Sequence, residues 1–261
     1  MGDTFYTDHW RDIEDDRIAR YEQMFQWRDG QAVLLEGAEL APGQRVLDLG
    51  SGPGFFAAAL AERVGSTGAV DGADINAQFV KSANARAADQ PNLNFHHVTD
   101  HMLPFDEGRF DRVIMKNVLE YVPDLAATLQ EAHRVTAPGG KAHVIDSDWG
   151  FVLVEPWGPD RTRQFFSAAG AAFREPLIGR RAPAALQAAG FAMPNVRINT
   201  HADQKGMGLN VLTNMAGYIR TFGTMAEDEV NAWLDEAQDA VSAGRFLFCL
   251  PQFLITADKP E

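Results

Sequence analysis

The chain has 261 residues with 46% hydrophobic content, which suits a single domain built around one sizeable core. Its formal net charge of −13 comes from 36 acidic against 23 basic side chains, so a basic surface that grips nucleic acid is not expected. Apolar runs stay well short of the roughly 20 residues of a membrane span, so a membrane partner is not expected either.

The first 20 residues are rich in Asp and Arg and lack the apolar region of a signal peptide, which favours a cytoplasmic location. Residues Asp15–Leu35 predict a helix, because Ile18, Tyr21 and Phe25 recur at helical spacing. A stripe of this kind usually packs against the core of the protein.

Residues 46–54 read Val-Leu-Asp-Leu-Gly-Ser-Gly-Pro-Gly and are followed by an Ala- and Leu-rich helix over Phe55–Val64. The apolar positions around Asp48 predict the end of a buried parallel strand. The turn after it lets the backbone approach a ligand, because glycines carry no Cβ. Strand, glycine turn and helix form the first crossover of a nucleotide-binding α/β domain. The three glycines of the turn are Gly50, Gly52 and Gly54.

The glycine spacing separates two kinds of nucleotide site. A dinucleotide site needs Gly-x-Gly-x-x-Gly, whereas the third glycine here comes one residue early and Phe55 follows it. The carboxylate of Asp48 would also repel a pyrophosphate and suits a cationic ligand. The segment resembles motif I of the class I S-adenosylmethionine-dependent methyltransferases, whose ligand carries a sulfonium and an ammonium group. This resemblance implies S-adenosylmethionine as cofactor and S-adenosylhomocysteine as product.

An acidic residue stands about twenty residues further on, at the end of the next predicted strand. The resemblance implies that Asp74 binds the two ribose hydroxyls, which a carboxylate can accept together. Ile75 would then pack on the adenine. The alternative is that Asp74 only caps the helix predicted over Ala77–Ala88.

A third strand is predicted over Asn94–Val98, and the loop after it is where the family recognises adenine. Asp100 is expected to accept a hydrogen bond from the adenine amino group, with backbone groups of His101 or Met102 beside it. The spacer to Leu-Pro-Phe is one residue shorter than usual, so Thr99 takes the place of the acid if that tripeptide fixes the register.

Residues Phe110–Asp124 resemble the fourth strand and following loop of small-molecule methyltransferases, the group that includes ubiquinone and menaquinone biosynthesis enzymes. Asn117 falls at the carboxyl end of that strand, where open α/β sheets bind ligands, and is a further cofactor candidate. The turn Ala137–Gly140 leads into a fifth strand over Lys141–Asp146.

The resemblance implies a Rossmann-like, seven-stranded and mostly parallel sheet with helices on both faces. The last two strands are predicted over Val196–His201 and Phe246–Ala257, with the last one antiparallel. Cys249 in that last strand cannot form an internal disulfide, and the chain shows no Cys and His spacing for a metal. The expected plan of the single domain 1–261 is an N-terminal helical lid (1–43), a cofactor-binding core (44–149), cap insertions (150–178 and 203–244) and a final strand (245–261).

The two cap insertions exceed the minimal fold and are expected to close a pocket for the methyl acceptor. Their helices are predicted over Asp160–Arg174, Val211–Phe222 and Glu227–Ala243, and another helix over Ala182–Ala189. An apolar, partly aromatic small molecule would suit their side chains, although many of these can instead build the core of the cap itself. The candidates are Trp149, Phe151, Trp157, Phe165, Phe166, Met207, Met215, Tyr218 and Phe222.

Methyl transfer from a sulfonium mainly requires that the acceptor be placed in line with it. A general base is needed only if the acceptor must lose a proton, and the candidates are Asp146, Asp148 and His201. Two adjacent carboxylates can raise one pKa and so create a base. The plainer interpretation of Asp146 and Asp148 is a loop cap.

Other functions stay open. The glycine spacing and Asp48 argue against a Rossmann dehydrogenase. A protein of the same fold that binds S-adenosylmethionine without transferring its methyl group would show the same cofactor residues. A methyltransferase acting on a protein is weakened by the expected cap. The acceptor atom and a homodimeric state are left undecided.

Overall fold

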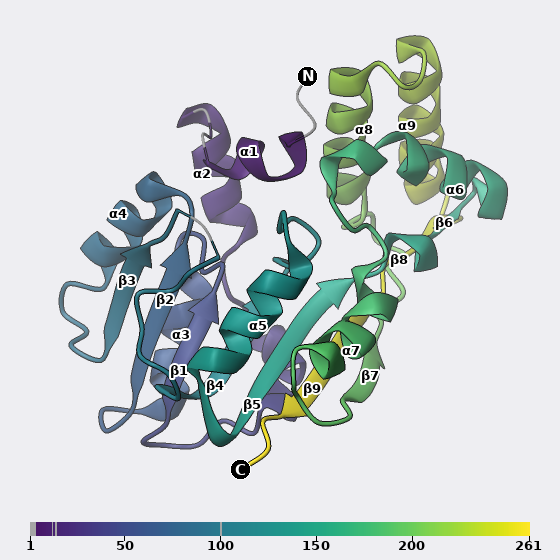
Figure 1. Ribbon diagram of the computed structural model, residues 1–261. Coiled ribbons are helices and arrows are strands. Elements are labelled where there is room, and N and C mark those ends of the chain that lie inside the picture. The colour runs from purple at the N-terminus through teal and green to yellow at the C-terminus, as the bar shows by residue number, and fades with distance from the viewer. Residues whose placement is uncertain (1–3, 12, 14, 100) are drawn as a thin grey trace.

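The computed structural model describes residues 4–11, 13, 15–99 and 101–261. A seven-stranded sheet runs through the molecule in the order β3-β2-β1-β4-β5-β9-β7 (Figure 1). All neighbours pair in parallel except β9, which is antiparallel to both β5 and β7, so the predicted fold class is confirmed. The strands are β1 (Arg45–Leu49), β2 (Ala69–Asp74), β3 (Leu93–His97), β4 (Phe110–Lys116), β5 (Thr136–Ser147), β7 (Asn195–Asn199) and β9 (Gln252–Asp258).

Both faces of the sheet are covered, as a parallel sheet requires. On one face, Val46, Val70 and Ile114 pack against the helices that flank the start of the cofactor core. On the other face, Leu47 and Val113 pack against a second set of helices. The first set is η1 (Asp29–Ala38), α3 (Phe55–Val64) and α4 (Ala77–Arg86), and the second is α5 (Leu125–Val135) and α7 (Ile178–Ala188).

The helix predicted over Asp15–Leu35 is wrong as a single element. The chain forms α2 (Asp15–Met24), a non-helical stretch, and then the 3₁₀ helix η1. Arg28 is extended at φ −128° and ψ 143°, and Trp27 beside it packs on Phe56 with ring centroids 5.2 Å apart. Packing on the core therefore outweighs the local periodicity that predicted one continuous helix.

The strand predicted over Phe246–Ala257 is likewise wrong as a single element. It divides into β8 (Leu247–Cys249) and β9, with Leu250 and Pro251 between them outside either strand. Pro251 lacks the backbone N–H that a central strand donates to its neighbour. As a result β8 leaves the main sheet and pairs instead with β6 (Leu153–Glu155).

The cap is a helical layer with its own core, and Figure 1 shows it beyond the carboxyl end of β5, with α1 (Phe5–Arg11) beside α8. It consists of η2 (Trp149–Phe151), β6, α6 (Gly158–Ala168), η3 (Gly170–Ala172), α8 (Leu209–Phe222), α9 (Glu227–Ser242) and β8. Most of the aromatic and Met side chains predicted to line an acceptor pocket pack into this cap core. Phe151 and Met207 instead lie largely exposed.

Candidate active site

A cavity of about 380 Å³ opens at the carboxyl ends of β1, β2 and β4. The strand order reverses between β1 and β4, because the chain passes from β1 to β2 and β3 on one side and returns as β4 on the other. Open α/β sheets bind their ligands at this kind of switch point. Of the predicted cofactor residues, the cavity is lined by Asp48, Gly50, Gly52, Asp74, Ile75, Thr99, His101 and Asn117.

The glycine turn brings backbone to the floor of the cavity. Gly50 has φ +79° and donates its N–H to the Ala73 carbonyl at 2.7 Å, and a Cβ on it would lie 2.2 Å from Val118 Cγ2. Gly54, at φ +87°, is the N-cap of α3 and leaves room for the Phe95 ring. Gly52 has open space around it, so a ligand can lie against its backbone. Only glycine suits the first two positions without strain.

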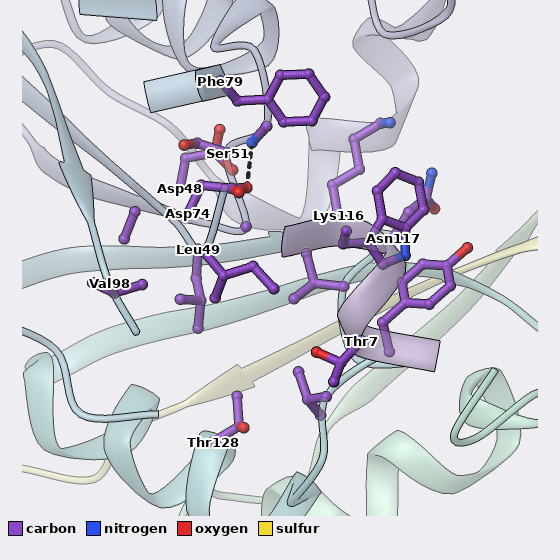
Figure 2. Close-up of a pocket in the computed structure, with 18 of the residues that line it drawn as sticks. Thr7, Asp48, Leu49, Ser51, Asp74, Phe79, Val98, Lys116, Asn117 and Thr128 are labelled. Carbon is purple, nitrogen blue, oxygen red and sulfur yellow. Dashed lines mark hydrogen bonds between the residues drawn. The ribbon is translucent and has the colours of Figure 1, made fainter. Parts of the chain in front are cut away.

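Asp74 ends β2 and holds the turn in place. Its Oδ2 accepts the N–H of Gly52 at 2.7 Å, drawn as a dashed line in Figure 2, and its Oδ1 accepts the N–H of Asn76 at 2.8 Å. The helix cap of α4 is Asn76, whose side chain accepts from Gln78 and Phe79. The capping alternative for Asp74 therefore does not describe this site. Each carboxylate oxygen of Asp74 keeps a further lone pair for a ligand hydroxyl.

Asp48 and Lys116 line the cavity from the neighbouring strands β1 and β4 (Figure 2). Asp48 is 1% exposed, and its Oδ2 has no hydrogen-bond partner within the described part of the chain. Burial raises the pKa of Asp48 to about 8, against the attraction of Lys116. Burial also lowers the pKa of Lys116, which Asp48 opposes. Both side chains are therefore poorly solvated, and a ligand group of opposite charge would stabilise the ionised form of each.

One wall of the cavity is apolar and includes Ile75, Val98 and Leu103. Of the residues predicted to contact adenine, Thr99 and His101 line the cavity, whereas Met102 is 57% exposed and is not among its lining residues. Asp100 lies outside the described residues, so the choice between Asp100 and Thr99 as the adenine contact stays a prediction.

The N-terminal helix α1 lies over the cavity and lines it with Thr7, Trp10 and Arg11. Asn76 Nδ2 donates to the backbone carbonyls of Trp10 at 2.8 Å and Arg11 at 3.3 Å, which fixes the helix to the cofactor core.

On its other side, α1 is joined to the cap. His9 Nε2 lies 3.3 Å from Tyr218 Oη on α8, and Phe5 packs edge-on against Phe222. Burial lowers the pKa of His9 to about 4, so this contact holds a neutral imidazole. The lid therefore spans from the cofactor core to the cap.

Asn117 follows β4 in the left-handed conformation at φ +54°, and its N–H donates to the Ile145 carbonyl at 2.8 Å. Its Oδ1 is buried and has no hydrogen-bond partner among the described residues. A strained backbone with an unsatisfied amide oxygen at a cavity is typical of a ligand-binding position.

The three predicted base candidates do not line the cavity. Asp146 accepts the N–H groups of Leu119 and Ser147, at 3.1 and 2.9 Å. Asp148 is fully buried and accepts two hydrogen bonds of 2.6 Å from the Arg180 guanidinium. His201 is exposed in the loop after β7. The catalytic role of these three residues stays a prediction.

Sequence reasoning missed Glu120 and Tyr121, which follow Asn117 in the loop after β4. Tyr121 lines the cavity, and Glu120 is buried behind it at 3% exposure. The Trp149 Nε1–H donates to Glu120 Oε2 at 2.6 Å. The sequence signal was present, because both residues lie in the loop after a strand whose carboxyl end faces the ligand edge.

Comparison with known proteins finds relatives of this chain in sequence and in fold. A family model for the methyltransferase domain matches residues 46–140. An uncharacterized 37.1 kDa protein of transposon TN4556 from Streptomyces fradiae is 30% identical, over 88% of this chain and 67% of that protein. A 2-phytyl-1,4-naphtoquinone methyltransferase from Nostoc sp. is 38% identical, over 50% of this chain and 62% of that enzyme.

The solved structure of a phosphoethanolamine N-methyltransferase 2 from Haemonchus contortus has the same fold, with a TM-score of 0.65 and 16% identity. The aligned region covers 100% of this chain and 61% of the Haemonchus contortus chain. The chain spans about half to two thirds of the length of the curated relatives that it matches. Residues 46–140 belong to the methyltransferase domain family, and over about half of its length the chain is similar to quinone methyltransferases.

Among the described residues, no cluster of His, Cys, Asp and Glu side chains is arranged to hold a metal ion. None of the helices in the described ranges has the length and apolar character needed to cross a membrane.

Proposed function

We propose that the protein transfers the methyl group of S-adenosylmethionine to a small, apolar or aromatic molecule inside the cavity beneath α1. The observation that carries this proposal is the buried Asp48, whose Oδ2 has no hydrogen-bond partner among the described residues, with Lys116 and Asp74 beside it in the cavity lining. The Nostoc relative is named as a naphthoquinone methyltransferase, which supports an aromatic acceptor.

The residues present fit the cofactor. Asp74 would accept the two ribose hydroxyls, while Asp48 would face the ammonium group and Lys116 the carboxylate of the amino acid end. A zwitterion offers an ammonium group to Asp48 and a carboxylate to Lys116 at once, which neither an NAD pyrophosphate nor an apolar ligand does. The open backbone at Gly52 gives the ligand a close approach. Adenine would lie between Ile75 and the loop Thr99–Leu103.

The bound cofactor supplies a methyl group that is already activated as a sulfonium. The chain then has to bind the acceptor in line with it and keep water out. Proximity and orientation can contribute up to about 7–11 kcal/mol to such a reaction. Trp10 and Phe25 form an apolar roof over the cavity, and Tyr121 adds an aromatic wall. Lid, core and cap would act as one catalytic unit. Cys249 is a free thiol, as is usual in a reducing compartment, and this supports a cytoplasmic location.

Calorimetric binding and product formation test the proposal. The protein should bind S-adenosylmethionine and S-adenosylhomocysteine but not NADH, and a small-molecule extract of cells should stimulate formation of S-adenosylhomocysteine. Asp74→Ala should weaken cofactor binding by roughly 100-fold or more, because it removes two charge-assisted hydrogen bonds worth about 1.5–3 kcal/mol each. The control Asp89→Ala, at an exposed position after α4, should bind as the wild type does. Binding of NADH, or cofactor binding unaffected by Asp74→Ala, would contradict the proposal.

A further inference from the structure

The strand β7 forms one edge of the main sheet, next to β9 (Figure 1). On its other side, no strand of the described structure pairs with it. An edge strand of this kind presents a row of N–H and C=O groups with which a further strand can pair. The opposite edge strand, β3, buries both of its apolar side chains, Leu93 and Phe95. β7 differs from it, because its two apolar side chains are exposed, Val196 at 43% and Ile198 at 52%.

The apolar face of the sheet continues past the helix that covers it. In the antiparallel pair of β7 and β9, Val196 lies opposite Ile255 and Ile198 lies opposite Phe253. Residues directly opposite one another share a face of the sheet. Ile255 and Phe253 are buried in the core cluster that contains α7. Val196 and Ile198 lie one strand further out, where α7 no longer shields this face from solvent.

Phe151 of η2 extends this exposed surface. Its ring packs edge-on against that of Phe253, with centroids 5.5 Å apart, and 48% of Phe151 is exposed. The Arg180 guanidinium lies 4.9 Å from the Phe151 ring centroid, but it is already paired with the buried carboxylate of Asp148. It therefore brings no unpaired charge to the surface. We call the three exposed apolar side chains the β7 patch: Phe151, Val196 and Ile198.

The other face of β7 carries one charge, and that charge is neutralised. Arg197 Nη1 pairs with Glu36 Oε2 of η1 at 2.7 Å. Unpaired charges on edge strands commonly prevent pairing with another chain, and Glu36 removes this obstacle. Residues 191–202 also contain no acidic residue, in a chain whose net charge is −13. Repulsion between two copies of the chain is therefore weaker along this edge than over an average part of the surface.

We propose that β7 is a dimer interface, at which it pairs in antiparallel fashion with β7 of a second copy of the chain about a two-fold axis at Arg197. Such an axis requires a surface that is complementary to itself. Val196 lies opposite Ile198 of the partner subunit, and Asn195 lies opposite Asn199 of the partner subunit. Pairs of β-branched apolar side chains in these positions stabilise a sheet. The inference does not depend on the proposed function.

The surroundings of the strand are compatible with this pairing. The two Arg197 side chains meet at the axis, and each brings its own Glu36, so that opposite charges alternate there. A stable interface buries about 800 Å² on each partner, more than one short strand provides. Phe151 and Met193, which is 83% exposed and lies two residues before β7, supply further apolar surface. The cavity at β1, β2 and β4 stays open, because β5 and β9 separate it from β7.

Sedimentation velocity over a range of protein concentrations tests the interface. The wild type should reach the mass of two chains. Ile198→Lys should weaken the dimer by roughly 100-fold or more, because it places a charge without a partner in an apolar contact. Met207→Lys is the matched control, since Met207 is 58% exposed and lies outside the β7 patch, and it should dimerise as the wild type does. A wild type that is monomeric at every concentration, or an Ile198→Lys variant that dimerises as tightly as the wild type, would overturn the proposal.

Cross-linking tests the pairing itself and does not depend on the Ile198→Lys variant being folded. In a Cys249→Ser background, Asn195→Cys and Asn199→Cys are introduced together. Opposed Cβ atoms in an antiparallel pair lie about 4.5–5.5 Å apart, a spacing from which a disulfide can close. Oxidation should convert this variant to a covalent dimer, whereas Asn195→Cys alone should stay uncross-linked because its opposite residue is Asn199. Equal cross-linking of the two variants, or none in either, would contradict the pairing of β7 with itself.

Discussion

Asp48 and Asp74 stand at the ends of neighbouring strands, yet their surroundings differ. Both oxygens of Asp74 accept backbone N–H groups, whereas Asp48 Oδ2 has no partner in the described structure. The sequence predicted that Asp48 suits a cationic ligand, because a carboxylate repels pyrophosphate. It did not predict Lys116, because a lysine ending an apolar strand gives no signal that its side chain turns into a cavity.

Binding of S-adenosylmethionine should release a proton from Asp48. In the free protein the raised pKa, about 8, keeps this carboxyl mostly protonated at neutral pH, and an ammonium ligand favours the ionised form. Affinity should therefore rise with pH up to about 8. Calorimetry in buffers of different ionisation heat measures the released proton. Asp48→Asn should abolish the release, and equal heats in all buffers for the wild type would contradict this assignment.

Asp148 should contribute to stability and not to chemistry. Its buried carboxylate pairs with Arg180, whose side chain is about half exposed, so Asp148→Asn should cost about 1–2 kcal/mol of unfolding free energy. Urea unfolding measures this cost. Arg180→Met should cost a similar amount, and the double variant should cost less than the sum. Loss of activity without loss of stability would instead place Asp148 in the reaction.

At the scale of elements, the glycine turn depends on one close approach. Gly50→Ala should destabilise the fold by more than the about 1–2 kcal/mol of left-handed strain, because its methyl group would collide with Val118. Gly223→Ala is the matched control, since Gly223 is left-handed at φ +63° and ψ 34° with open space around it. Urea unfolding compares the two variants. Equal losses of unfolding free energy in the two variants would show that the contact with Val118 relaxes. The double variant Gly50→Ala/Val118→Ala should recover part of the difference.

The attachment of α1 to the cofactor core can be tested separately from helix capping. Asn76→Asp keeps the oxygen that caps α4 but loses the amide donor to Trp10 and Arg11. Hydrogen exchange in residues 5–11 should become faster by roughly 10-fold, as expected for about 1–1.5 kcal/mol of lost hydrogen bonding. Exchange within α4 should change little. Unchanged exchange in α1 would show that the cap contacts alone hold the lid.

The elements of the cofactor core were predicted well because each has a local signal. Strand, glycine turn and helix follow one another over residues 45–64 as expected. Elements whose packing partners lie far away in the sequence were predicted less well. The stripe in Asp15–Leu35 gave no sign that Trp27 would turn onto Phe56, and Phe246–Ala257 gave no sign that β8 would pair with β6.

Across the whole molecule, the cap closes one end of the sheet around a core of its own. Composition indicated an apolar acceptor but not which side chains would meet it, because the helical spacing of an aromatic residue does not tell on which side its partner lies. Trp157, Phe165 and Met215 are buried in the cap core, while Trp10, Phe25 and Tyr121 line the cavity. Two of these three rings, Trp10 and Phe25, come from the N-terminal segment, whereas the cap aromatics listed in the sequence analysis do not line the cavity.

The central claim is methyl transfer to a small molecule, and the most direct measurement follows the methyl group itself. The protein is incubated with S-adenosylmethionine labelled in the methyl group and with a cell extract, which is then divided into small-molecule, protein and nucleic acid pools. We predict label in the small-molecule pool, lost with Asp74→Ala and retained with Asp89→Ala. Label in the protein or nucleic acid pool, or bound cofactor with no transfer to any pool, would contradict the account.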